Sequence, residues 1–75
     1  MPFVYRTTDD LIKIAGAGGG LVLDAATRST EDLIRIAHAG SAKRVQLVFK
    51  GLATRSTEDL IKIAFAGNGC VQFAD

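Results

Sequence analysis

The segments TRSTEDLIRIAHAG (27–40) and TRSTEDLIKIAFAG (54–67) decide the fold, because they repeat one helical pattern almost without change. They differ at two of fourteen positions, and the larger change is the one between His38 and Phe65. A looser third copy, YRTTDDLIKIAGAG, occupies positions 5–18. Internal repetition of this kind predicts one structural unit used three times, with a core shared between neighbouring units.

Each copy carries the signals that begin and end a helix. A Thr or Ser hydroxyl stands where an N-cap accepts a hydrogen bond from a backbone amide, and an Asp follows three residues later. A glycine then follows, at a position where a left-handed backbone suits it. The sequence predicts helices over about 8–17, 30–39 and 57–66, each roughly 15 Å long. The expected N-caps and stops are Thr7 and Gly18, Ser29 and Gly40, and Ser56 and Gly67.

Each expected helix has an apolar face and a charged stripe. In the second copy Leu33, Ile36 and Ala37 recur at spacings of three and four residues, and Glu31 and Arg35 mark the other side. At about 100° per residue, the position that varies between the copies lies roughly 120° from the centre of the apolar face. It is therefore a flank position and not a core position.

Four short segments rich in Val, Leu and Phe predict strands. They are Phe3–Arg6, Leu21–Asp24, Arg44–Lys50 and Cys70–Ala74. Their alternation with the helices predicts a single α/β domain over 1–75, of order βαβαβαβ, with a four-stranded, mainly parallel sheet and right-handed crossovers.

The third predicted strand has one apolar and one polar face. Val45, Leu47 and Phe49 point to one side, whereas Gln46 and Lys50 point to the other. This division predicts two layers with the helices on one face, although parallel sheets are nearly always covered on both faces. Three alternatives stay open. A second chain covers the polar face, the first helix crosses to it in a small doubly wound three-layer sheet, or the strand pairing is partly antiparallel.

Composition limits the classes of function. The chain has 75 residues, a net charge of +1 and one cysteine, which excludes an intrachain disulfide. Nucleic-acid binding is disfavoured because it needs clustered Lys and Arg. No apolar run approaches the ~18 residues of a membrane span. We therefore expect a soluble protein that is compatible with cytoplasmic expression. We expect neither nucleic acid nor a membrane as its partner. The near-neutral charge gives little repulsion between copies, so the formation of a homo-oligomer is an open alternative.

Two groups of residues superficially resemble functional sites, one a dinucleotide-binding loop and the other a catalytic or zinc site. GAGGG (16–20) superficially resembles a dinucleotide-binding loop, but it follows a helix and precedes a strand, the reverse of the required order. His38 and Cys70 are alone in their residue types, and they lack the further groups that a nucleophilic or zinc site needs. We expect no enzyme activity, no cofactor and no metal.

The helix starts form one candidate binding site. The motif TRST places hydroxyls, amides and an arginine at a helix N-terminus, where anions bind. The acidic residues that follow at once would repel a phosphate and favour capping instead. The candidate anion site consists of Arg28, Ser29, Arg55 and Ser56.

A second candidate is an interface with another copy of the chain. The aromatic side chain at the varied flank position either packs on a neighbouring helix or contacts another molecule. The uncharged polar face of the sheet offers another surface for association. The candidate interface residues are Phe65, His38, Gln46 and Gln72.

The STEDLIKIA helices with their Ser caps and glycine stops, the Glu-to-Lys pairs and the stretch AKRVQLVFKG resemble computationally designed, idealised α/β proteins. The caps, apolar pattern and loop residues agree with one another, as design rules require. The resemblance is one of style, covers most of residues 5–74 and points to no natural family. The resemblance implies that the chain has no natural substrate. From the residues we expect a structural, non-enzymatic scaffold domain that self-associates through the uncharged sheet face or the flank containing Phe65; the alternative is a binding module for an anionic ligand.

Overall fold

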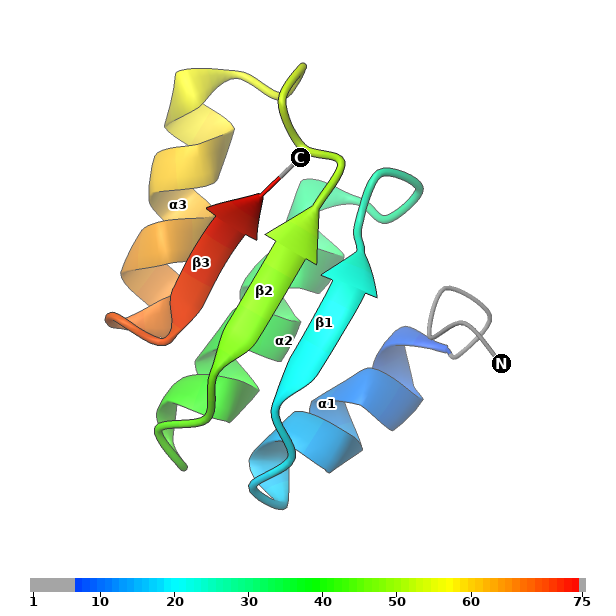
Figure 1. The fold of residues 1–75 in the computed structure, drawn as a ribbon, viewed down its shortest axis with the longest axis vertical. Coiled ribbons are helices and arrows are strands. Elements are labelled where there is room, and N and C mark those ends of the chain that lie inside the picture. Colours follow the sequence, from blue (N-terminus) through cyan, green and yellow to red (C-terminus); the bar gives the residue numbers. More distant parts are fainter. Residues whose placement is uncertain (1–6, 75) are drawn as a thin grey trace.

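The computed structural model describes residues 7–74, in which helices and strands alternate (Figure 1). The helices are α1 (Thr8–Gly16), α2 (Thr30–Ser41) and α3 (Thr57–Gly67). The strands are β1 (Leu21–Asp24), β2 (Leu47–Lys50) and β3 (Val71–Ala74). All strand pairs in this region are parallel, in the order β1-β2-β3.

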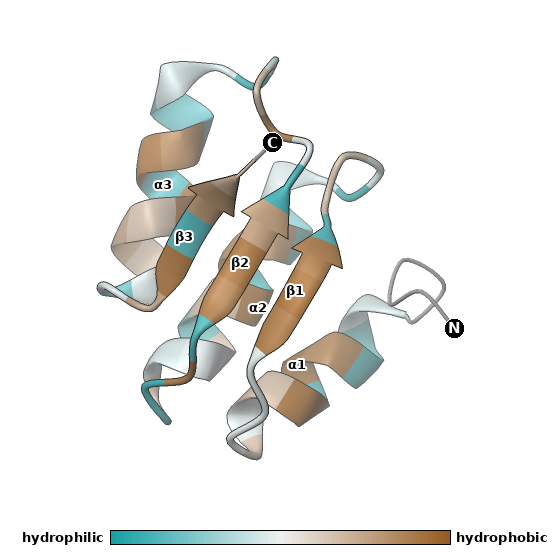
Figure 2. Ribbon diagram, in the orientation of Figure 1, coloured by the Kyte–Doolittle hydropathy of each residue, from teal (hydrophilic) through white to brown (hydrophobic). Residues whose placement is uncertain are grey.

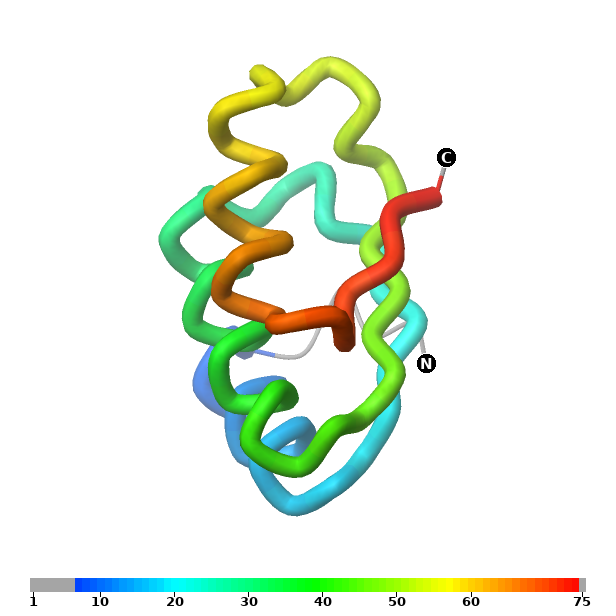
Figure 3. Tube along the Cα trace, turned by 90° about the vertical axis from the view of Figure 1, so that its left-hand side faces the viewer, coloured from blue at the N-terminus to red at the C-terminus, as the bar shows by residue number. Residues whose placement is uncertain are grey.

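All three helices cover the same face of the sheet, so residues 7–74 form two layers (Figures 1 and 3). Helix α2 packs between α1 and α3. The predicted α/β class and parallel pairing are therefore confirmed, and neither the three-layer alternative nor antiparallel pairing occurs in this part of the chain. The predicted strand Phe3–Arg6 lies outside the described residues, so four strands are not shown.

The three predicted N-caps are confirmed. The hydroxyls of Thr7, Ser29 and Ser56 each accept a hydrogen bond from the backbone amide three residues later, at 3.1, 3.2 and 3.2 Å. Each cap residue has an extended backbone, as an N-cap requires. Local hydrogen bonding therefore fixes where α1, α2 and α3 begin.

The predicted glycine stops are right at one helix and wrong at two. Gly18 has a φ of +104°, just beyond α1. Gly40, however, lies within α2, and Gly67 is the last residue of α3. The left-handed position after α3 belongs to Asn68, with φ +48°, because asparagine also tolerates this conformation.

Gly40 and Gly67 have a different role, which is to let a helix approach the following strand closely. A Cβ atom on Gly40 would lie 2.7 Å from Cδ1 of Leu47, and one on Gly67 would overlap Cγ2 of Val71. Any larger residue would therefore push the helix away from its strand. The repeated glycine reflects tertiary packing and not a helix stop.

The core fills the space between the helix layer and the sheet. Val45, Leu47 and Phe49 are buried, while Gln46 and Lys50 are exposed, so the predicted division of the two sheet faces is confirmed. Strands β1 and β2 are hydrophobic up to a hydrophilic last residue, β3 has one hydrophilic residue between hydrophobic ones, and the two kinds alternate along the helices (Figure 2). The large side chains that are fully buried are Phe49, Leu11, Leu23, Leu33, Ile36, Leu47 and Ile63.

Candidate functional site

Arg28 and Arg55, two of the residues predicted to bind an anion, each join neighbouring repeats. Nη1 of Arg28 donates to Oγ1 of Thr8 at 2.9 Å, and Nη1 of Arg55 donates to Oγ1 of Thr30 at 2.7 Å. Thr8 and Thr30 hold the same position at the starts of α1 and α2. The two bonds are therefore one contact made twice, from the loop before a helix to the start of the preceding helix.

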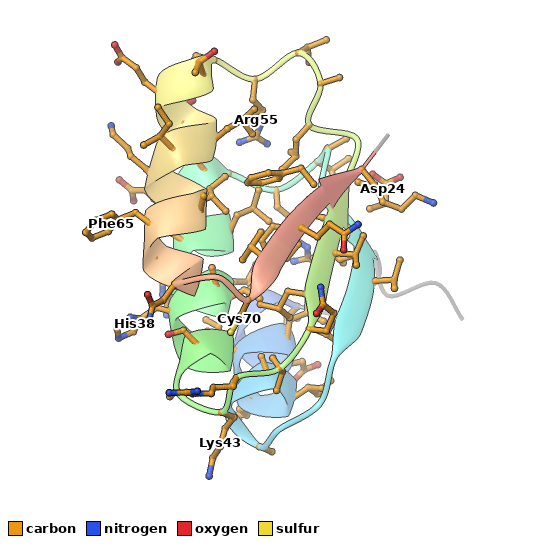
Figure 4. The ribbon with its side chains drawn as sticks, turned by 60° about the vertical axis from the view of Figure 1, so that its left-hand side comes forward. Asp24, His38, Lys43, Arg55, Phe65 and Cys70 are labelled. Carbon is orange, nitrogen blue, oxygen red and sulfur yellow. The ribbon has the colours of Figure 1, made fainter. Side chains whose placement is uncertain are left out.

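Further hydrogen bonds connect the two contacts. Nη2 of Arg55 donates to the carbonyl oxygen of Arg28, and Oγ1 of Thr8 donates to Oδ2 of Asp32 at 3.2 Å. Arg55 reaches inward from the loop before α3 (Figure 4). The bonds from Arg28 to Thr8 and from Arg55 to Thr30 are partly buried and charge-assisted, which makes them stronger than bonds between neutral groups. The structure thus brings both arginines into one hydrogen-bond network. Their guanidinium groups donate to Thr8, to Thr30 and to the carbonyl oxygen of Arg28.

Ser29 and Ser56, the other two residues of the candidate anion site, serve as the N-caps of α2 and α3. Their hydroxyls accept from the amides of Asp32 and Asp59. The acidic side chains of the same first turns lie near the positive ends of the helix dipoles. A bound anion would have to compete with these groups at each helix start.

The candidate interface residues lie on two opposite faces, so the structure does not bring them together. Nε2 of Gln46 and Oε1 of Gln72 form a hydrogen bond of 3.4 Å on the face of the sheet that the helices leave open. The side chain of Val22, 62% exposed, lies on this face as well. His38 and Phe65 point away from the sheet, on the outer side of the helix layer (Figure 4).

Phe65 is 87% exposed. It therefore does not pack on a neighbouring helix, which was one of the two interpretations of the aromatic flank position. His38 is also exposed at the equivalent position of α2, and both residues border a shallow depression with Ser41 and Asn68. An exposed ring of this size is available for contact with another molecule.

Cys70 is half-buried immediately before β3, where its carbonyl accepts a hydrogen bond from the amide of Leu47 at 2.8 Å. His38 lies on the outer side of the helix layer, while Cys70 lies at the start of the strand (Figure 4). Within residues 7–74 no group of three or more His, Cys, Asp or Glu side chains is arranged to hold a metal ion.

The sequence pattern does not single out one further surface, the edge formed by α3 and β3, beside which no other helix or strand lies among residues 7–74. Ile61 on this edge is 60% exposed and Ala64 is exposed, whereas Leu60 is half-buried. Val71 and Phe73 of β3 are also only half-buried. Repetition is the signal that could have identified this edge. The second copy buries its Leu33 and Ala37, and the third copy carries the same residue types, Leu60 and Ala64, at positions that are more exposed.

Comparisons of the chain with protein-family models, with curated proteins and with solved structures found no match. Within the described part of the chain, no helix combines the length and the apolar character needed to cross a membrane.

Proposed function

We propose that the chain is a structural scaffold domain without catalytic activity that associates with copies of itself. The observation that carries this proposal is the incomplete burial of the two layers. Parallel sheets are nearly always covered on both faces, but here the second face carries an exposed Val22. Ile61 and Phe65 are exposed in the helix layer as well.

The charge of the chain supports the same proposal. A net charge of +1 on 75 residues gives little electrostatic repulsion between copies, so apolar contact is not opposed over long distances. Removing exposed apolar surface from water is favourable by about 25 cal/mol per Å². The resemblance to designed α/β proteins is also consistent with a scaffold, since such a protein has no natural substrate.

The alternative function, binding of an anionic ligand at the helix starts, has weaker support. Backbone amides and two arginines do gather around α2 and α3. The donors of Arg28 and Arg55, however, already bond to Thr8, Thr30 and the carbonyl of Arg28. An anion would have to break contacts that join the repeats.

Size-exclusion chromatography with light scattering tests the proposed function. We expect a mass above the 7.9 kDa of one chain that rises towards a limit as the concentration increases. A mass of one chain at high micromolar concentration would show that the protein is monomeric and would overturn the proposal.

A further inference from the structure

Neighbouring repeats of the chain contact one another in the same way twice. Helix α2 packs on α1 and α3 packs on α2, while β1 pairs with β2 and β2 pairs with β3 in parallel (Figure 1). The hydrogen bonds from Arg28 to Thr8 and from Arg55 to Thr30 follow the same pattern. One kind of contact between successive units therefore occurs twice within residues 7–74.

The earlier helix of each contact contributes an apolar side. A Cβ atom added to Gly67 of α3 would lie 3.7 Å from Cβ of Ala37, so Ala37 is on the side of α2 that faces α3. Ala37 is fully buried, whereas the equivalent Ala64 of α3 is exposed. Ile34 of α2 is half-buried, and the equivalent Ile61 of α3 is 60% exposed. No further helix or strand lies beyond α3 and β3 among the described residues, so this side of the third repeat is uncovered there.

The later helix of each contact contributes a side with both charged and apolar residues. On α2 this side holds Asp32, which accepts a hydrogen bond from Thr8 of α1. It also holds Arg35, which forms an ion pair with Asp9 of α1 at 3.7 Å. Ile36 lies four residues after Asp32 and therefore shares its side. Because Ile36 is fully buried while Arg35 is exposed, the charged groups flank an apolar contact without preventing it.

The equivalent side of α1 is less buried than its counterparts on α2 and α3. Ile36 and the equivalent Ile63 of α3 are fully buried, whereas the equivalent Ile14 of α1 is only half-buried. Ala39 of α2 is half-buried, whereas the equivalent Ala17 of α1 is exposed. Residues 7–74 thus carry one half of the contact at α1 and the other half at α3 and β3.

Two surfaces that match each other are therefore available at opposite ends of the helix layer. In repeat proteins each unit contacts only its neighbours, and the outer side of a terminal unit is polar where the array ends. We call the two surfaces the α3–β3 edge and the α1 edge. The α3–β3 edge is made by Leu60, Ile61, Ala64, Val71 and Phe73, and the α1 edge is made by Asp10, Lys13, Ile14 and Ala17.

We propose that the α3–β3 edge of one copy is covered by the α1 edge of a second copy, through the contact that already joins the repeats. This inference rests on the proposed function and specifies its interface. Within the chain, Ile12 of α1 and Ala39 of α2 border one groove, so Ala17 of the second copy is expected beside Ile61 of the first. Strand β1 of the second copy then pairs in parallel with β3 of the first and continues the sheet.

The charges at the two edges favour the same arrangement. Within the chain, Arg35 of α2 forms an ion pair with Asp9 of α1. The equivalent residues at the uncovered edges are Lys13 on α1 and Glu58 on α3, which again carry opposite charges. The second copy therefore brings its lysine towards the glutamate of the first. Both side chains belong to exposed residues, so the pair selects the partner edge more than it adds affinity.

The helices on one face give the layer a curvature that allows copies to close into a ring. Contacts between two different edges form either an open array or a closed ring. Helices pack about 8–10 Å apart, whereas strands lie about 4.8 Å apart, so a layer with one helix per strand curves with its strands on the inside. All three described helices lie on one face of the described strands (Figure 3). We therefore expect a ring, which limits the mass that association can reach.

Blocking one edge at a time tests the inference. Ile61→Glu places a charge on the α3–β3 edge, and Ala17→Glu places one on the α1 edge, each at a residue that is exposed in the single chain. We expect each variant alone to associate about tenfold or more weakly than the unchanged chain, measured by light scattering over a concentration series. An equimolar mixture should recover association, because each variant supplies the edge that the other lacks. The mixture should stop at a mass of two chains, since one intact edge of each kind is then used.

A matched control lies on the open face of the sheet. Val22 is 62% exposed there and Ile61 is 60% exposed, so Val22→Glu adds the same charge at a site of similar exposure. This variant should associate like the unchanged chain. Ala64→Glu and Lys13→Glu give a second variant on each edge, and circular dichroism checks that all the variants are folded.

The outcomes separate the inference from the proposed function. If the unchanged chain associates and neither variant on the α1 edge has an effect, that edge is not part of the interface and the inference is wrong. If variants on both edges weaken association but their mixture does not recover it, the two edges do not bind each other. If Val22→Glu alone prevents association, the chain associates through its sheet face instead. A monomeric unchanged chain would overturn the proposed function itself.

Discussion

Nη1 of Arg55 donates a hydrogen bond to Oγ1 of Thr30 at 2.7 Å, which ties the loop before α3 to the start of α2. Arg28 makes the equivalent bond to Thr8, one repeat earlier. The relationship explains why each of the two near-identical repeats begins with Thr-Arg-Ser-Thr. The arginine holds the preceding repeat, the serine caps its own helix, and in the second repeat the last threonine receives the next arginine.

Replacing this arginine should lower the stability of the domain. We expect Arg55→Ala to reduce the free energy of unfolding by about 1–2 kcal/mol, because the bond is charge-assisted but only partly buried. Urea unfolding followed by circular dichroism measures the loss. Arg35→Ala is the control, because its ion pair with Asp9 is largely exposed and should contribute less than about 0.5 kcal/mol. Equal losses in the two variants would contradict the role of Arg55 as a tie between repeats.

The glycine at the end of α3 should tolerate no side chain. Gly67→Ala is expected to destabilise the protein by about 1–3 kcal/mol, because the new Cβ overlaps Cγ2 of Val71. Gly16 provides a matched control, since it also ends a helix but a Cβ added there would meet no atom within 4 Å. Gly16→Ala should leave stability unchanged or raise it by up to about 1 kcal/mol. Thermal unfolding of the two variants compares them directly; similar melting temperatures would argue against close packing at Gly67.

The N-cap of α3 should respond to the identity of its side chain. Ser56→Ala removes the acceptor for the amide of Asp59 and should cost about 1 kcal/mol in unfolding free energy. Ser56→Gly should cost only a few tenths of a kcal/mol, because glycine is itself a tolerated N-cap. Chemical denaturation measures both values. The capping role would be refuted if the alanine variant were as stable as the glycine variant.

Inorganic phosphate should not stabilise the protein beyond an ionic-strength effect, because Arg28 and Arg55 are engaged within the chain. We expect equal melting temperatures in phosphate and in chloride solutions of the same ionic strength. A rise in phosphate that disappears in the double variant Arg28→Ala and Arg55→Ala would favour the anion-binding alternative.

Much of the fold follows from local patterns in the sequence. Ser29 and Ser56 were predictable as N-caps because an N-cap depends on a hydroxyl and an amide three residues apart. The burial of Leu47 and exposure of Gln46 were predictable because side chains alternate along a strand. Gly40 shows the limit of this reasoning. Its spacing matches a helix stop, but the residue is needed where α2 meets Leu47, and that contact is not visible in the local pattern.

The sequence by itself determined the repeated helix starts, the two faces of the strands and the α/β class, because these depend on hydrogen bonds and periodicity within a few residues. Only the tertiary structure decided that the arginines tie repeats together and that Leu60 is less buried than its identical counterpart Leu33. The reason is physical. The environment of a side chain depends on which segments pack beside it, and identical repeats acquire different neighbours according to their place in the layer.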